Sequence, residues 1–262
     1  MPTYLLTIAY DGARCHGWQL QHNGITIQEE LERALAAIDL PGVRVEGAGR
    51  TDAGVHAIAQ CAHVVLPRPF EPERLLMAMN THLPPDIAVQ AVREVPAGFH
   101  ARFCARGKRY VYRCRCSRVR PAIGRHLYHW VRREVDLDAM RAAAAHLVGR
   151  HDFAAFASNP GRKLVRGTVR TLHHAHLIRR AEGFDFAVQG SGFLYNQVRN
   201  MVGSLLEVGY GNRSPDWLRE VRDARDRRRG GPTAPAAGLY LLRVLYAPDL
   251  SPGPEPGADD DV

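Results

Sequence analysis

Hydrophobic residues along the chain either alternate with polar ones or recur every three to four positions, and these two spacings are typical of strands and helices. In the first half they predict strands over 3–10, 43–48, 59–66 and 86–94, and helices over 27–38 and from Glu71-Pro72 to just before Pro84. Thr26 and Glu29 have the spacing of a capping box, which supports the start of the first helix. The order β-α-β-β-α-β is typical of a ferredoxin-like unit, whose antiparallel sheet carries helices on one face.

The second half shows a similar succession. We expect strands over 108–116, 167–178, 183–189 and 238–246, and helices over 136–147, 193–209 and 214–227, whereas 120–135 and 150–166 show only weak patterns. The sequence therefore predicts an α/β (α+β) protein with two ferredoxin-like, or RRM-like, lobes over 1–104 and 105–247. A basic cleft is expected between the lobes, and 248–262 is expected to be a disordered acidic tail.

The charge of the chain narrows the class of partner. The formal net charge is +8, and all but two of the 35 basic side chains are arginines. Arginine suits phosphate and base contacts, so we favour a polyanionic partner, nucleic acid above all, over a mere compositional habit. No run of eighteen apolar residues and no basic leader is present, and five scattered cysteines do not resemble a disulfide framework. We expect a cytoplasmic protein that does not contact a membrane.

One glycine-rich stretch, GAGRTDAGVHAIAQ at 47–60, surrounds Asp52. Glycines allow tight turns and close approach of a ligand to the main chain. Two interpretations stay open on spacing alone. The stretch is either a hairpin loop with a solvated carboxylate or a loop that holds a reactive acid between two strands.

Two other positions combine charge or aromatic character with a regular element. Tyr110 and Tyr112 share one face of a predicted strand among basic residues, a pattern that fits nucleotide stacking and also ordinary packing. Arg199 lies on the helix 193–209 beside its apolar face, which is formed by Leu194, Val198, Met201, Val202 and Leu205. It is either a functional cation or a surface arginine that snorkels past the core.

No cofactor motif accompanies these residues. Cys114 and Cys116 lack a second ligand pair, so we expect no metal site there. Neither a phosphate-binding GxxxxGK[ST] loop nor a dinucleotide fingerprint occurs, and there is no nucleophilic serine elbow. We therefore expect no metal and no cofactor.

Six motifs in register resemble the tRNA pseudouridine synthase A family. They are GAGRTDAGVHA at 47–57, YDG at 10–12 with GWQ at 17–19, FHARF at 99–103, KRYVYR at 108–113, FLYNQVRNMVGSLLEVG at 193–209, and GLYLLRVLY at 238–246. The resemblance covers about residues 3–247. Cys15-His16 and Gln197 depart from the commonest pattern, in which aromatic residues and a methionine stand at these places.

The resemblance implies a function and roles for four residues. Asp52 is similar to the essential aspartate that attacks the target nucleotide, and Arg50 to the arginine that enters the RNA near the vacated base. Tyr110 corresponds to the tyrosine that stacks on the flipped uracil, and Arg199 to the arginine that pairs with the aspartate. The implied enzyme is a cofactor-free isomerase, a homodimer, that converts uridines 38, 39 and 40 of the tRNA anticodon stem-loop to pseudouridine.

Two alternatives remain open at this point. One is a non-catalytic, RRM-like RNA-binding protein that uses the same basic and aromatic residues. A binding protein gains nothing from a carboxylate placed among phosphates, so Asp52 argues against it. The other is a pseudouridine synthase that acts on another RNA, which only the substrate can distinguish.

Overall fold

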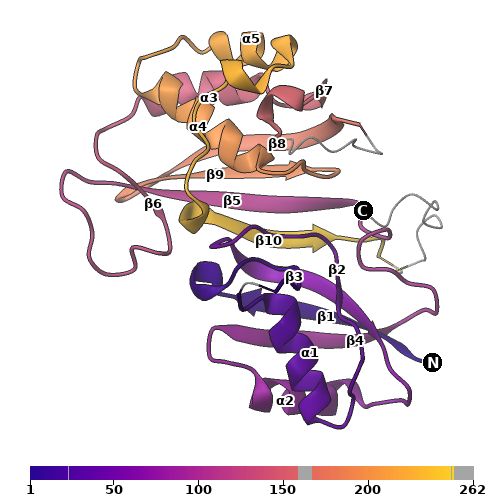
Figure 1. Cartoon of the computed structure of the whole chain (residues 1–262). Coiled ribbons are helices and arrows are strands. Elements are labelled where there is room, and N and C mark those ends of the chain that lie inside the picture. Colours follow the sequence, from indigo (N-terminus) through magenta and orange to yellow (C-terminus); the bar gives the residue numbers. More distant parts are fainter. Residues whose placement is uncertain (23, 159–166, 249, 251–262) are drawn as a thin grey trace. The chain divides into compact units, whose positions relative to one another are not determined.

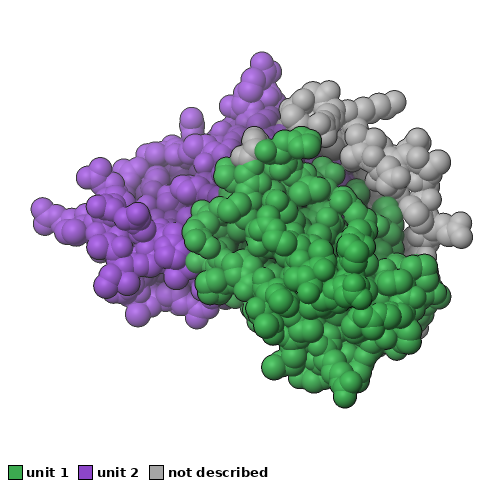
Figure 2. Space-filling view, turned by 60° about the horizontal axis from the view of Figure 1, so that its bottom comes forward, with its two compact units in different colours: residues 1–106, 240–262 green, residues 107–239 purple. Residues whose placement is uncertain are grey.

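The computed structural model describes residues 1–22, 24–158, 167–248 and 250. The chain forms two compact units, the first from 1–106 together with 240–262, the second from 107–239 (Figure 2). Each unit has its own strands and its own helices (Figure 1). In the described part of the chain, no helix is long and apolar enough to cross a membrane.

The first unit has the expected β-α-β-β-α-β order. Its elements are β1 (Thr3–Tyr10), the short 3-10 helix η1 (Gly12–Arg14), α1 (Ile27–Ala37), β2 (Glu46–Gly47), β3 (His56–Val65), α2 (Pro72–His82) and β4 (Ile87–Val95). β1 pairs antiparallel with β3 and with β4, and β2 pairs antiparallel with β3. This is the ferredoxin-like arrangement that the hydrophobic spacing predicts, so that prediction is confirmed.

Alternation along β1 creates the core of this unit. Tyr4, Leu6 and Ile8 point to one face of the sheet and are fully buried. On α1, Ile27, Leu31, Ala34 and Leu35 are buried as well, and α1 and α2 lie beside each other (Figure 1). The Thr26 hydroxyl accepts a hydrogen bond of 3.3 Å from the Glu29 amide, so the predicted helix cap is present.

The second unit also contains both strands and helices. Its elements are β5 (Gly107–Cys116), β6 (His129–Val131), α3 (Leu137–Ala145), β7 (Gly149–Asp152), η2 (Ala154–Phe156), β8 (Val169–Arg180), β9 (Gly183–Gly190), α4 (Gln197–Gly209), α5 (Trp217–Ala224), η3 (Arg227–Arg229) and η4 (Ala236–Gly238). The strands β5, β9, β8 and β7 follow one another in an antiparallel sheet, and β6 pairs in parallel with β5. The short strands β6 and β7 fall in the two segments whose sequence patterns are weak.

Some boundaries differ from the sequence-based expectation. The helix expected from 193 begins at Gln197, because Asn196 has a φ of 60°, a left-handed conformation that a helix cannot contain. The strand expected over 43–48 is only Glu46–Gly47. The last strand, β10 (Leu239–Leu245), which the pattern groups with 105–247, pairs in parallel with β3 of the first unit. Apart from Pro248 and Leu250, the expected tail lies outside the described residues.

Candidate active site

Asp52 lies in the loop that joins β2 to β3, and the base of this loop is closed by two hydrogen bonds. The amide of Ala48 donates to the Cys61 carbonyl over 2.7 Å. The side-chain amide of Gln60, which is fully buried, donates to the Gly49 carbonyl over 2.9 Å. Because β3 provides both partners, the start of the loop is fixed to the sheet.

Thr51, the residue before Asp52, is held by both its backbone and its side chain. Its carbonyl accepts a 3.0 Å hydrogen bond from the Trp18 amide. Its hydroxyl lies 2.8 Å from the hydroxyl of Tyr10, the last residue of β1. A Cβ atom on Gly17 would lie 2.6 Å from the Thr51 carbonyl oxygen, and Gly17 has a φ of +89°. The motifs YDG and GWQ are therefore the supports of the Asp52 loop.

The turn after Asp52 closes tightly. The Asp52 carbonyl accepts from the Val55 amide over 3.1 Å, and Gly54, with a φ of 78°, donates its amide to the Cys15 carbonyl over 3.3 Å. Cys15 is buried, and burial raises the pKa of its thiol to about 11, so this thiol stays neutral near pH 7. At this departure from the family pattern, the protein thus has a small, uncharged packing residue. Asp52 itself is half-buried.

Arg50 is exposed, yet its direction is set by a chain of side-chain amides. Its Nε donates to Gln19 Oε1 over 3.0 Å, and Gln19 Nε2 donates to Gln28 Oε1 over 3.0 Å. Gln28 is buried on α1 and donates to Glu32 Oε1 over 2.9 Å. This chain connects the guanidinium of Arg50 to a helix, so the side chain is oriented before any ligand binds.

Tyr110 and Tyr112 share one face of β5, as the alternation predicts, but they differ in their contacts. Tyr112 is fully buried, and its hydroxyl donates to the Pro235 carbonyl over 2.7 Å. Burial also raises its pKa well above the usual value, so Tyr112 is a neutral packing residue. Tyr110 is 8% exposed and meets Phe193 nearly at right angles, with 5.0 Å between the ring centroids. Phe193 therefore fixes the plane of the Tyr110 ring.

Arg199 is half-buried on α4, and its guanidinium is held in place. Its Nε donates to the Ala234 carbonyl over 2.8 Å, and its Nη1 donates to Asn196 Oδ1 over 2.9 Å. The Ala234 amide in turn donates to the Arg199 carbonyl over 3.2 Å. These bonds differ from what is expected of a mobile arginine that snorkels along a surface, because both ends of the residue are anchored.

The segment 230–235, here called the strap, is itself tied to α4. Asn200 and Ser204, both fully buried, provide the attachment. Asn200 Oδ1 accepts from the Thr233 hydroxyl over 2.7 Å and from Arg227 over 2.9 Å, and Ser204 Oγ accepts from the Gly231 amide over 2.9 Å. The carbonyl of Ala234 that holds Arg199 is thus part of a rigid framework.

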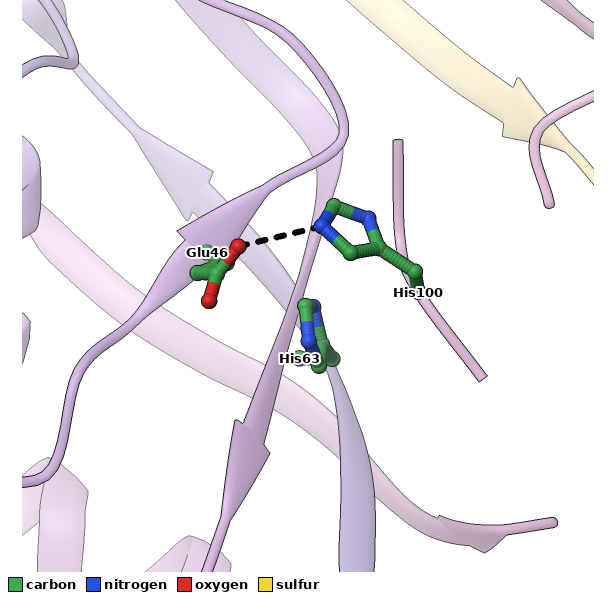
Figure 3. Close-up of side chains that lie close together, drawn as sticks. All are labelled: Glu46, His63 and His100. Atoms are coloured by element: carbon green, nitrogen blue, oxygen red, sulfur yellow. Dashed lines mark hydrogen bonds and ion pairs between the residues drawn. The ribbon is translucent and has the colours of Figure 1, made fainter. Parts of the chain in front are cut away.

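A separate cluster in the first unit, formed by Glu46, His63 and His100, brings three possible metal ligands within 4.8 Å of one another (Figure 3). His100 Nε2 lies 3.0 Å from Glu46 Oε2, and the two imidazole centroids are 4.6 Å apart. The hydrogen bond with His100 lowers the pKa of Glu46, whereas burial lowers the pKa of His63.

Hydrogen bonds on the other nitrogens argue against a metal in this cluster. Nδ1 of His100 accepts from the Arg102 amide over 3.1 Å, and Nδ1 of His63 accepts from the Ala101 amide over 3.3 Å. In neutral imidazole an accepting Nδ1 requires the proton on Nε2, which is then unable to bind a metal. The cluster fits a clasp that ties the FHARF turn to β2 and β3.

The four residues singled out from the sequence fall into two pairs. Asp52 and Arg50 share one loop of the first unit, and Tyr110 and Arg199 belong to the second unit. Asn196 contacts Arg199, and Phe193 contacts Tyr110. The sequence indicated these two residues only as members of a motif and gave no sign of their supporting roles. Ala234 has no sequence signal at all, because its contribution is a backbone carbonyl. Gln197, the third departure, is buried and accepts from the Leu194 amide over 2.7 Å, which supports the turn before α4.

Comparison with known proteins shows which sequences this chain is similar to. The family model described as tRNA pseudouridine synthase matches residues 6–104 and 143–247, which include Arg50, Asp52 and Arg199, whereas Tyr110 falls between the matched segments. A tRNA pseudouridine synthase A of Methylibium petroleiphilum is 45% identical over 94% of this chain and 94% of its own. The protein of the same name from Acetivibrio thermocellus is 41% identical over 92% and 98%. The one from Myxococcus xanthus is 44% identical over 100% and 98%.

Proposed function

This chain belongs to the tRNA pseudouridine synthase family, and from that premise we propose that it converts uridines 38, 39 and 40 of the tRNA anticodon stem-loop to pseudouridine. The family makes it an isomerase that acts on tRNA. The observation that carries the proposal is the loop around Asp52, whose neighbour Thr51 is bound by Tyr10 and Trp18. A rigid loop of this kind is what a reactive carboxylate needs.

The reaction is a rearrangement within one nucleotide. The N1–C1′ bond breaks, the uracil turns while it stays bound, and a C5–C1′ bond forms. The proton on C5 is lost and N1 gains one, so no group leaves and no electron is transferred to a cofactor. We therefore propose that the reaction needs no metal and no cofactor.

Asp52 is the group that we propose to start this reaction. An ionised carboxylate acts either as a nucleophile or as a base that moves a proton of the sugar. Both routes need the charged form. We assign to Arg199 the cation that keeps the acid ionised, supported by the fixed position of its guanidinium against Ala234 and Asn196.

The remaining two residues are proposed to handle the displaced base. Removing a uridine from the stack costs a few kcal/mol, and stacking on an aromatic ring returns about 1 to 3 kcal/mol per base. We assign this stacking to Tyr110, whose plane Phe193 fixes. We assign to Arg50 the contact with the RNA near the vacated position, because Gln19 orients its guanidinium. A homodimer in the cytoplasm, where tRNA is available, completes the proposal.

The decisive experiment separates chemistry from binding. Wild-type protein and the variant Asp52→Asn are incubated with tRNA that carries tritium at C5 of uridine, and tritium release is measured. We expect Asp52→Asn to lower kcat on the order of a thousandfold or more, while its Kd for tRNA changes less than about threefold. Asp39→Asn, a change of the same chemistry outside the Asp52 loop of the same unit, is the matched control.

The possible results distinguish the alternatives. Full activity of Asp52→Asn would remove Asp52 from the mechanism. Wild-type protein that binds tRNA tightly but releases no tritium would be an RNA-binding protein. Mapping of the modified positions to nucleotides other than 38–40 would identify another RNA site as the target.

A further inference from the structure

An arginine-rich groove lies in the second unit. It has a volume of about 440 Å³ and is lined by thirteen residues, among them five arginines and one acid: Arg118, Arg132, Arg133, Arg179, Arg180 and Glu134. None of these six residues belongs to the sites described above. The groove is therefore a separate feature of this unit.

Regular structure supports much of the groove. Cys116 ends β5, Arg179 and Arg180 end β8, and Phe184 lies near the start of β9. The register pairs Cys114 with Phe184 and Phe184 with Arg179, so Arg179 shares a sheet face with buried residues. The sheet thus fixes the backbone from which these side chains extend.

The charge in the groove is poorly compensated. Arg180 forms an ion pair of 2.7 Å with Asp185. Within the described residues, no carboxylate lies at ion-pair distance from Arg118, Arg132, Arg133 or Arg179. Two of these four guanidinium groups are near aromatic rings, Arg133 at 3.9 Å from the Tyr210 centroid and Arg132 at 5.6 Å from that of Trp130. An aromatic ring orients a guanidinium and leaves its charge in place.

Four positive charges in one groove repel one another, and a ligand with several negative charges relieves this repulsion. Planar guanidinium groups match phosphate geometry in particular. The phosphodiester backbone of a nucleic acid carries one negative charge per nucleotide and can place several charges along an open groove. A single small anion places its charge at one point only.

The distance between the groove and Tyr110 indicates which part of the RNA the groove contacts. Cys116 lies six residues beyond Tyr110 on the same strand, or about 20 Å at the rise of a β-strand. This is further than one nucleotide reaches. We propose that the groove binds the phosphodiester backbone of the tRNA several nucleotides away from the uridine that reacts, an inference that rests on the proposed function.

The test uses a double substitution that removes charge without a loss of packing. Arg118 and Arg179 are exposed, so Arg118→Ala with Arg179→Ala is expected to fold normally. The matched control is Arg120→Ala with Arg125→Ala, two exposed arginines of the same connection between β5 and β6 that do not line the groove. Each protein is titrated with full-length tRNA at several salt concentrations, and kcat and KM are measured.

We expect the groove variant to bind tRNA about tenfold more weakly at 0.1 M salt, with a salt slope that is smaller by about 1 to 2. Its kcat at saturating tRNA is expected to be unchanged, because the groove touches no reacting atom. The control is expected to stay within about twofold of wild type. A second variant, Arg118→Lys with Arg179→Lys, keeps the charge and is expected to recover most of the salt slope.

Two results would overturn the inference. One is a groove variant whose tRNA affinity and salt slope equal those of the control. The other concerns inorganic phosphate, whose binding is measured by calorimetry. If the wild-type protein binds phosphate and the groove variant does not, while both bind tRNA equally well, the groove is a site for small anions. A failure of the proposed function is distinguishable from a failure of this inference. If the proposed function is wrong, the wild-type protein releases no tritium, whereas the binding titration still tests the groove.

Discussion

The hydroxyl of Tyr10 lies 2.8 Å from the hydroxyl of Thr51, so the end of β1 is hydrogen bonded to the residue directly before Asp52. Tyr10 is almost fully buried, and burial raises its pKa, which keeps the phenol neutral. β1 lies between β3 and β4 in the sheet. This hydrogen bond connects it to the proposed catalytic loop.

Removing this bond is expected to affect turnover more than binding. Tyr10→Phe and Thr51→Val each delete one hydroxyl and should each cost about 1 kcal/mol of stability. We expect each to lower kcat several-fold with little change in KM, because Asp52 loses part of its positioning. In the double variant the loss of kcat should equal that of either single variant. Additive losses would show that the two hydroxyls act independently.

A second prediction concerns Gly17. Alanine there would have to adopt a φ of +89° and place its Cβ 2.6 Å from the Thr51 carbonyl oxygen. We expect Gly17→Ala to destabilise the protein by about 2 kcal/mol or more and to lower kcat. Gly42 has a similar φ of +77°, and a Cβ atom there would meet no other atom within 4 Å, so Gly42→Ala controls for the backbone conformation alone. Equal effects of the two variants on kcat would disprove the contact argument.

Asn200 is expected to be the most sensitive polar residue of the second unit. Asn200→Ala removes the hydrogen bonds that the Asn200 side chain forms with the Phe156 carbonyl, the Thr233 hydroxyl and Arg227. We expect a loss of about 3 kcal/mol in the free energy of unfolding, because buried polar groups are costly to leave unsatisfied. Because the strap then loosens around Arg199, kcat should fall even at temperatures where the variant is fully folded. Circular dichroism measures the stability of the variant, and tritium release from the same sample measures its kcat.

The clasp predicts a particular dependence of stability on pH. Burial lowers the pKa of His63 in the folded protein, so the unfolded chain takes up a proton there first, starting near pH 6.5. Stability should therefore decrease as the pH falls below about 6.5 and through the folded pKa. Glu46, whose folded pKa is lowered, loses its stabilising effect only in the more acidic range below about pH 4.5. Urea unfolding of His63→Gln between pH 7 and 5 should show a flatter profile than wild type.

Zinc provides an independent check on the same cluster. Because Nδ1 of His63 and His100 both accept backbone amides, we expect one equivalent of Zn²⁺ to shift the Tm by less than about 1 °C. A clear rise in Tm that is absent from His100→Ala would instead establish a metal site.

Much of the first unit follows from local sequence signals. The alternation in β1 and the pair Thr26 and Glu29 define their elements without help from the rest of the chain. The second unit is less predictable, because β6 and β7 are three and four residues long and depend on pairing with β5 and β8. The late start of α4 could not be read from hydrophobic spacing, since it depends on the left-handed conformation of Asn196.

The candidate site shows the same limit. Asp52, Arg50 and Arg199 stand out because their residue types suit the chemistry. The groups that hold them include the carbonyls of Ala234 and Cys61, which have no signature in sequence. Sequence therefore indicates which side chains to consider, while the backbone that positions them is visible only in the fold.

The parallel pairing of β10 with β3 has a consequence for synthesis on the ribosome. The first unit is discontinuous, since its last strand is separated from the rest by residues 107–239. At ordinary translation rates, an interval on the order of ten seconds passes before β10 emerges. During that time the edge of β3 near His56 lacks its final neighbour. The newly made chain should therefore complete its first unit only after its second, a reversal of the usual order from N-terminus to C-terminus.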